Sequence, residues 1–170
     1  MTIANYVTLG RLLLIPLLVV LLLFQINGLG VALFLLLSFS DAVDGWIARK
    51  YNQVSDLGKF LDPLADKVLV TSALIVLVGV GQADTVAVLI LIAREFIVQG
   101  IRINEARYQR IIAASPVAKW KTGTQVAAVA MLILNLPFAG AVLWLSVAFS
   151  LLSGGAYLWE SKILKQLKLN

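Results

Sequence analysis

The chain has 170 residues, of which 61% are hydrophobic and only 14% are charged, and its mean hydropathy is +0.95. Soluble domains carry about a quarter charged residues, so this composition excludes an ordinary soluble fold and indicates a membrane protein. Cysteine and histidine are both absent, which excludes disulfides, the usual zinc ligands and a histidine general base. Any acid–base or metal chemistry must therefore use Asp, Glu, Lys, Arg or Tyr.

Long apolar segments along the chain predict six helices joined by short connections. They are expected at about residues 4–26, 31–51, 59–80, 84–106, 116–134 and 139–167. Turns are expected at 25–30, where Asn and Gly gather, at 79–82, and at 135–137 around a proline. We therefore expect an all-α integral membrane protein with six transmembrane helices that form one membrane domain over residues 1–170.

Charge is distributed unevenly between the two sides of these helices. The turns at 25–30, 80–84 and 135–138 hold one charge, Asp84. Basic residues gather at the other connections and in the tail, at Arg49, Lys50, Lys59, Arg107, Arg110, Lys119, Lys121, Lys162, Lys165 and Lys168. The positive-inside rule makes that side cytoplasmic, with both termini on it. The net charge of +5 suits anionic membrane lipids, and no nucleic-acid partner is expected.

Four carboxylates lie close together in the segment 41–66. Asp41 and Asp44 are three residues apart, and Asp62 and Asp66 are four apart, so each pair lies on one face of a helix. Oxygen ligands without His or Cys favour Mg²⁺ or Mn²⁺ where phosphate is present. Two such ions can clamp a diphosphate and leave one carboxylate free to take a proton. The alternative is that the aspartates only pair with nearby cations, but four carboxylates at membrane depth exceed that need.

A second, basic set lies on the fourth and fifth expected helices. It consists of Arg94, Arg102, Lys119 and Lys121. Arginine binds phosphate through two parallel N–H donors and lysine through its point charge, so this set is suited to a second anionic group. Glu95 is expected to pair with a nearby arginine. The alternative for the set is a basic face that contacts lipid headgroups, and Arg94 argues against it because it lies deep in an apolar run.

The spacing of the acidic segment resembles a known family signature. Asp41-x2-Asp44-Gly45-x2-Ala48-Arg49-x8-Gly58-x3-Asp62-x3-Asp66 matches every position of the motif of the CDP-alcohol phosphatidyltransferases. The resemblance implies a six-helix fold, a homodimer and a site for two divalent cations. It also implies CDP-diacylglycerol as donor and CMP as leaving group.

The same resemblance implies roles for individual residues. Asp41, Asp44, Asp62 and Asp66 would ligate the metals, and Asp66 would also be the base that activates the acceptor hydroxyl. The CDP moiety would be bound around Asn5, Thr8, Gly45, Ala48, Arg49 and Gly58. The glycines and Ala48 would leave room for the nucleotide, and Arg49 would contact phosphate.

Sequences outside the signature indicate the acceptor alcohol. The segments 58–67, 93–102 and 119–122 are similar to those of the phosphatidylglycerophosphate synthases, the branch of the family that uses glycerol 3-phosphate. Arg94, Arg102, Lys119 and Lys121 would then hold the acceptor phosphate. Two alternatives keep the chemistry and change the acceptor, to phosphatidylglycerol (a cardiolipin synthase) or to an inositol phosphate. A divalent-cation transporter is a third possibility, but no charged residues continue the path outward.

Two further expectations follow from this interpretation. The enzyme is expected in a bacterial cytoplasmic membrane, with its active site facing the cytoplasm. The segment 153–155, Ser-Gly-Gly, also resembles a family pattern, although packing of small residues between helices explains it equally well.

Overall fold

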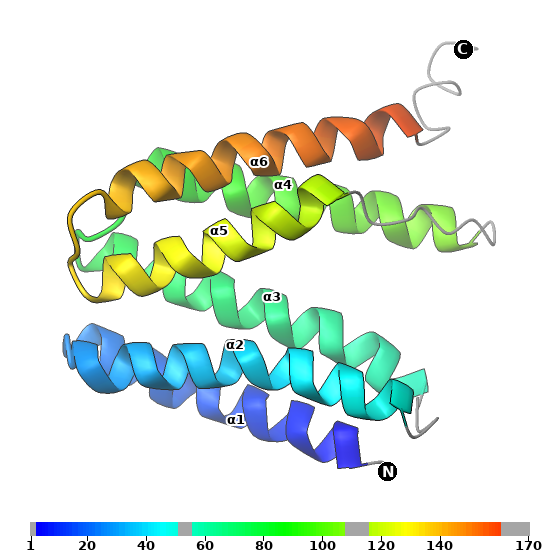
Figure 1. The fold of residues 1–170 in the computed structure, drawn as a ribbon, viewed down its shortest axis with the longest axis horizontal. Coiled ribbons are helices and arrows are strands. Elements are labelled where there is room, and N and C mark those ends of the chain that lie inside the picture. The colour runs from blue at the N-terminus through cyan, green and yellow to red at the C-terminus, as the bar shows by residue number, and fades with distance from the viewer. Residues whose placement is uncertain (1–2, 51–55, 108–115, 161–170) are drawn as a thin grey trace. The chain divides into compact units, whose positions relative to one another are not determined.

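The structure is a computed structural model that describes residues 3–50, 56–107 and 116–160, with side chains for 8–40, 64–103, 105 and 119–157. These ranges contain six α-helices and no strand (Figure 1). The helices are α1 (Ile3–Leu23), α2 (Asn27–Lys50), α3 (Asp56–Gly79), α4 (Thr85–Arg107), α5 (Pro116–Ile133) and α6 (Ala139–Glu160). The predicted all-α class with six helices is confirmed for the described residues.

One predicted turn is wrong in its extent. The break between α1 and α2 occupies only residues 24–26, and residues 27–30 form the first turn of α2. Gly30 is buried, and a Cβ atom added there would lie 3.0 Å from Cδ2 of Leu22. Gly30 therefore allows α1 and α2 to approach closely, and it is not part of the turn between them.

The turns after α1, α3 and α5 all have the same backbone geometry. Gln25, Gly81 and Asn135 adopt left-handed φ angles of 54°, 75° and 52°. In each turn the amide of the following residue donates to a carbonyl five residues earlier, as from Ile26 to Leu21 at 2.9 Å. This is the Schellman arrangement, which satisfies the last free carbonyls of a helix. Glycine is preferred at such a position, so Gln25 occupies it at a cost in free energy.

The chain divides into two compact units, and the first comprises Met1–Ala83 with Val129–Pro137. In this unit α1 packs against α3 and α2, and α2 also packs against α3. The buried positions of α1 are Thr8, Arg11, Ile15, Leu18 and Leu22. They alternate at spacings of three and four residues, so they form one stripe along the helix. Two polar side chains thus continue the apolar stripe of α1.

The second unit comprises Asp84–Ala128 with Phe138–Asn170, and in it α4 packs along α6. Leu91, Val98 and Ile101 are buried on α4. The facing stripe of α6 is rich in small residues, with Ser146, Ser150, Ser153 and Gly154 all buried. Small side chains at a helix interface leave room for a long side chain from the partner helix.

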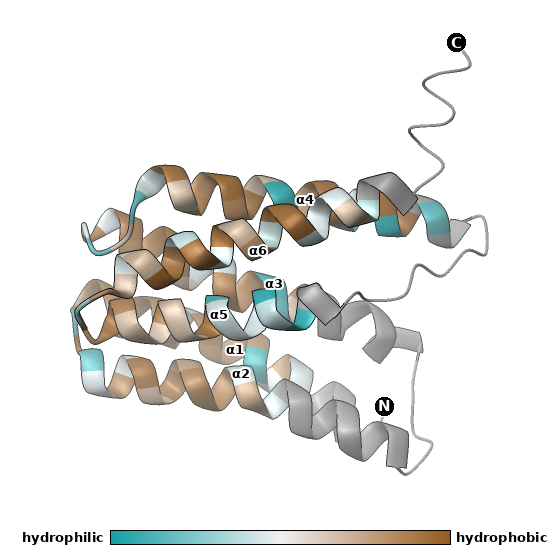
Figure 2. Ribbon diagram, turned by 45° about the horizontal axis from the view of Figure 1, so that its top comes forward, coloured by the Kyte–Doolittle hydropathy of each residue, from teal (hydrophilic) through white to brown (hydrophobic). Residues whose placement is uncertain are grey.

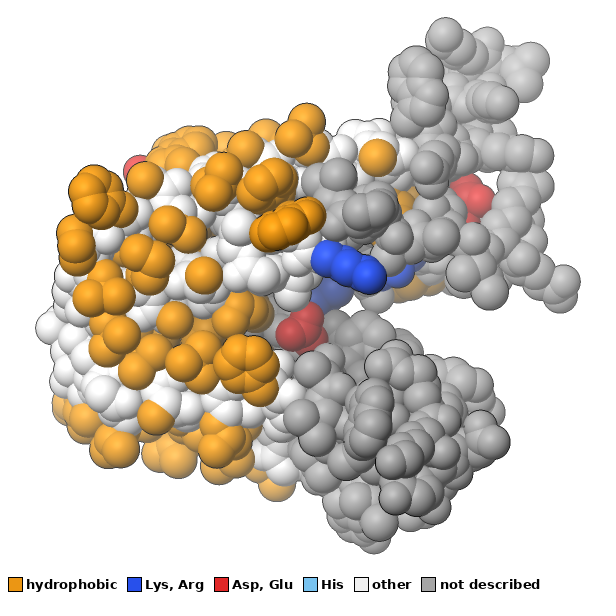
Figure 3. Space-filling view, in the orientation of Figure 1, with side chains coloured by type: hydrophobic (Ala, Val, Ile, Leu, Met, Phe, Trp, Pro, Cys, Tyr) orange, Lys and Arg blue, Asp and Glu red, His pale blue; other side chains and the backbone are white. Residues whose placement is uncertain are grey.

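The described parts of the helices are mostly hydrophobic (Figure 2), and many of their large hydrophobic side chains are exposed. On α1 the exposed positions include Leu13, Leu17, Val20 and Phe24, with Leu13 78% exposed. Figure 3 shows hydrophobic side chains over much of the described surface that faces the viewer. A helix that is hydrophobic all round belongs in a protein core or in a membrane. These hydrophobic side chains are not covered by the rest of the protein, which indicates that lipid surrounds them.

Length and hydropathy give a more limited result for individual helices. Within the described residues, the stretch Ala139–Tyr157 of α6 is long and apolar enough to cross a membrane. Thr8–Leu23 and Asn27–Ser40 are apolar but shorter. The fold is thus that expected of a helical membrane protein, with one clear span in this part of the chain.

Candidate active site

The acidic signature lies on two neighbouring helices of the first unit. Asp41 and Asp44 are in α2, and Asp62 and Asp66 are in α3, which packs against α2. The carboxylate of Asp66 is half-buried and takes part in a polar interaction. The side chains of the other three aspartates lie outside the described part of the structure. The backbone is helical at both aspartate pairs, as the prediction that each pair shares one helix face requires.

The chemistry of this donor set fits magnesium or manganese. All four side chains offer carboxylate oxygens, which hard divalent cations prefer, and the chain has no His or Cys to recruit zinc. Among the side chains that the structure describes, no group of three His, Cys, Asp or Glu forms a metal cluster. Only Asp66 of the four candidate ligands falls within that set.

The residues predicted to bind CDP are distributed over α1, α2 and α3. Thr8 is buried, with 1% of its surface exposed, and it takes part in a polar interaction. Its place on the buried stripe of α1 directs it into the first unit. The side chains of Asn5, Ala48 and Arg49 and the surroundings of Gly45 and Gly58 are not described, although the backbones of all five residues belong to these helices.

Arg11 is a buried charge that the sequence reasoning did not include among the site residues. It is 2% exposed, takes part in a polar interaction, and lies one turn beyond Thr8 on the same stripe. Arg11 and Asp66 lie about 18 and 20 Å from the ends of their parallel helices at a rise of 1.5 Å per residue. The two charges are therefore at a similar level of the first unit. The three-four spacing of α1 was the signal that could have identified Arg11.

Arg94 is the best-defined residue of the basic set. Its side chain is 10% exposed. Nε donates to the backbone carbonyl of Ser150 at 2.8 Å, and Nη2 donates to Oγ of Ser153 at 2.6 Å. Nη1 donates to Oε1 of Glu95 at 3.1 Å. Both serines belong to α6, so the arginine of α4 is fixed by the neighbouring helix.

Glu95 links Arg94 to Lys121. Its Oε1 accepts a hydrogen bond from Nζ of Lys121 as well as from Arg94. The side chains of Glu95 and Lys121 are 16% and 10% exposed. The expected pairing of Glu95 with an arginine is thus confirmed, and Lys121 is a second partner. Two cations thus share one carboxylate, and the formal charge of these three nearly buried side chains is positive.

The other two basic candidates do not join this cluster through any recorded contact. Arg102 is exposed, and its Cζ lies 5.6 Å from the centre of the buried Tyr157 ring. This distance allows a cation–π interaction. Lys119 is exposed at the start of α5. Of the four predicted acceptor residues, the structure brings Arg94 and Lys121 together.

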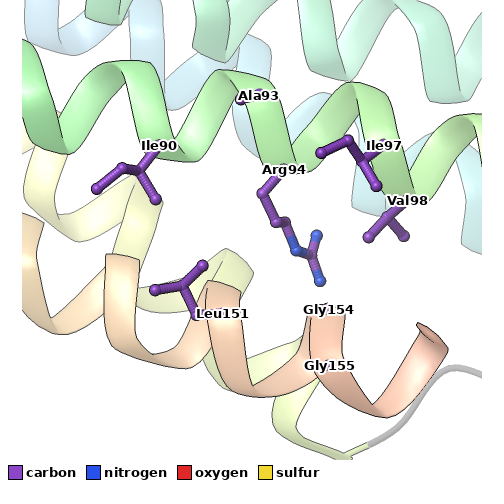
Figure 4. A pocket seen from close by; sticks show the side chains of 8 residues that line it. All are labelled: Ile90, Ala93, Arg94, Ile97, Val98, Leu151, Gly154 and Gly155. Atoms are coloured by element: carbon purple, nitrogen blue, oxygen red, sulfur yellow. The ribbon is translucent and has the colours of Figure 1, made fainter. Parts of the chain in front are cut away.

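A cavity of about 380 Å³ lies between α4 and α6 beside the guanidinium group (Figure 4). Its lining is Ile90, Ala93, Arg94, Ile97, Val98, Leu151, Gly154 and Gly155. The side chain of Arg94 extends from α4 toward Gly154 (Figure 4). Its lining is mainly apolar, and Arg94 is the charged residue in it.

Sequence reasoning attributed the small residues of α6 equally to packing and to a family pattern. In the structure Ser150, Ser153 and Gly154 surround the side chain of Arg94. Arg94 itself occupies the seam of α4, three residues after Leu91 and four before Val98. The role of α6 required knowledge of which helix packs on α4, and one sequence does not give that pairing.

Comparisons with known proteins agree with the motif. Residues 1–152 match the family model described as CDP-alcohol phosphatidyltransferase. The CDP-diacylglycerol–glycerol-3-phosphate 3-phosphatidyltransferase of Bacillus subtilis (strain 168) is 38% identical, over 92% of this chain and 95% of that protein. The protein of the same name from Rickettsia typhi is 38% identical, over 90% and 93%. Another from Pseudomonas fluorescens is 34% identical, over 94% and 86%.

Proposed function

This chain belongs to the CDP-alcohol phosphatidyltransferase family, and from that premise we propose that it transfers the phosphatidyl group of CDP-diacylglycerol to glycerol 3-phosphate. The products are phosphatidylglycerophosphate and CMP, and the reaction serves phospholipid biosynthesis. Relatives that bear this activity in their names align with nine-tenths of the chain. The observation that carries the proposal is the pair of fixed cations, Arg94 and Lys121, in a chain that also has the acidic signature.

The four aspartates of the signature would hold two divalent cations, Mg²⁺ or Mn²⁺. Asp41, Asp44, Asp62 and Asp66 provide only hard oxygen ligands, which supports this choice of metal. When bound, the ions supply charge neutralisation for the diphosphate of the donor. Asp66 takes the proton from the primary hydroxyl of glycerol 3-phosphate. That hydroxyl attacks the β-phosphorus, its new P–O bond replaces the bond to CMP, and no covalent enzyme intermediate is required.

The first unit would bind the nucleotide. Thr8, buried on α1, offers a hydroxyl, and we propose that Asn5 acts with it on the CDP moiety. Gly45, Ala48 and Gly58 leave space for the nucleotide. Arg49 contacts a donor phosphate, for which a planar guanidinium is suited.

The second unit would bind the acceptor. Lys121 and Arg94 attract the phosphate of glycerol 3-phosphate, and Arg102 and Lys119 add to the positive field at the same helices. The net positive charge of the Arg94–Glu95–Lys121 cluster favours an anionic acceptor over an uncharged alcohol. Phosphatidylglycerol and an inositol phosphate are also anionic, so they are the acceptors to be compared with glycerol 3-phosphate.

We propose that the six helices form a single membrane domain with both termini in the cytoplasm. The apolar outward faces of the helices support a lipid surrounding. The gathering of basic residues in the helix ends on either side of the α2–α3 connection, and around the α4–α5 connection, supports the orientation. The relatives come from bacteria, so the location is the bacterial cytoplasmic membrane, with the active site at its inner face. A homodimer is the expected assembly.

The role of Asp66 is tested with two variants assayed for CMP release from CDP-diacylglycerol vesicles. Asp66→Asn should reduce release by at least about a thousandfold, because the base and a metal ligand are lost together. Asp84→Asn is the matched control, since Asp84 caps α4 through a 2.8 Å bond from the amide of Ala87 and asparagine caps equally well. Substantial activity of folded Asp66→Asn would contradict the role.

A further inference from the structure

The orientation of Arg94 is set by α6. Three bonds engage three of the five guanidinium N–H groups, those to Ser150, Ser153 and Glu95. Within the described part of the structure, one N–H on Nη1 and one on Nη2 remain. Guanidinium N–H groups are strong, charge-assisted donors to phosphate oxygens. The geometry of the pair depends on how the side chain is held.

Gly154 fixes the path of the same side chain. A Cβ atom at this position would lie 3.0 Å from Nε and 3.4 Å from Cγ of Arg94. The distance to Nε is shorter than ordinary van der Waals contact, the distance to Cγ is at its lower limit, and the guanidinium of the arginine is held by three bonds. It would therefore have to shift by a few tenths of an ångström. The next residue, Gly155, also lines the cavity, yet a Cβ there would meet nothing within 4 Å.

We propose that Ser153 and Gly154 are positioning residues for the acceptor, which act on its phosphate through Arg94. Ser153 anchors Nη2, and Gly154 leaves the space in which Nε reaches α6. Together they present the two remaining N–H groups of Arg94 to the phosphate of glycerol 3-phosphate. The inference rests on the proposed function, and it extends the acceptor site to a third helix, α6.

Packing alone does not account for the arrangement. Ser146 lies seven residues before Ser153 on the same buried face, and both hydroxyls bond a carbonyl of their own helix three residues earlier. Ser153 additionally accepts a bond from Arg94. The two serines share burial and local bonding, and they differ in the contact with the cation.

Four variants test the inference through the kinetics of CMP release in vesicles. Ser153→Ala should raise the KM for glycerol 3-phosphate about tenfold, the effect of a lost bond to a charged group. Gly154→Ala should raise it several-fold, because small displacements of a positioning group are costly. The KM for CDP-diacylglycerol should stay within about twofold in both. The matched controls Ser146→Ala and Gly155→Ala should leave both constants near those of the wild type.

Each outcome bears on one claim. If the wild type responds to glycerol 3-phosphate and Ser153→Ala equals Ser146→Ala, the positioning role is overturned. Equal KM values for Gly154→Ala and Gly155→Ala overturn the role of the close contact. If both substrates lose affinity together, or if kcat alone falls, the residues are structural. Absence of acceptor-dependent CMP release by the wild type overturns the proposed function and this inference with it.

Discussion

Glu95 holds two cations together, so its neutralisation should destabilise the second unit. Glu95→Gln keeps an oxygen that can accept hydrogen bonds from Arg94 and Lys121 but removes the negative charge. The variant then has two positive side chains, each only 10% exposed, that have lost the carboxylate they share. Like charges in such a place are mutually unfavourable and poorly hydrated.

The magnitude follows from the geometry. At 3.1 Å, and with an effective dielectric constant of about 20, the attraction between Arg94 and Glu95 is about 5 kcal/mol before desolvation. Desolvation of the ions and the partial exposure of the carboxylate offset about half of this. We expect Glu95→Gln to lose about 2–3 kcal/mol of stability. For a chain of this length that corresponds to a fall in Tm of about 5–10 °C.

The assay is thermal unfolding of the purified protein in detergent, with and without inorganic phosphate. Phosphate should bind more tightly to the variant, because Arg94 and Lys121 have lost the negative charge of Glu95. It should therefore raise the Tm of Glu95→Gln more than that of the wild type. Asp84→Asn, at the exposed residue that caps the start of the same helix, is the control for loss of a carboxylate. A Tm equal to that of the wild type, with no added effect of phosphate, would refute the reasoning.

The remaining predictions concern backbone strain and metal. Gln25→Gly should raise the free energy of unfolding by about 1 kcal/mol and Gly81→Ala should lower it by about the same, because both positions have left-handed φ. Denaturant unfolding measures each change, and two changes of the same sign would contradict this explanation. Chelation with EDTA should abolish CMP release, and Mg²⁺ or Mn²⁺ but not Na⁺ should restore it; activity that survives exhaustive chelation would exclude a metal role.

The helices could be predicted from sequence because each is a long apolar run. Their ends were less certain: the glycines and asparagine at 27–30 indicated a turn, whereas they start α2 and let it approach α1. Local composition cannot distinguish these uses of glycine. The difference depends on Leu22, which belongs to another helix.

The candidate site was predicted in part for a similar reason. Arg94 and Lys121 were identified from charge and depth, and their shared partner Glu95 was expected to pair with an arginine. Ser150 and Ser153 could not be assigned, because their bonds to Arg94 join residues 56 and 59 positions apart. The buried position of Arg11 could have been found, since it continues the three-four spacing of α1.

The most direct test of the proposed activity compares the amount of labelled lipid formed with the amount of CMP released. Purified wild-type protein in CDP-diacylglycerol vesicles is supplied with radiolabelled glycerol 3-phosphate and Mg²⁺, and CMP and lipid-extractable label are measured together. We predict one labelled lipid formed for each CMP released. Release of CMP without label in the lipid, or label transfer only when another alcohol replaces glycerol 3-phosphate, would contradict the assignment.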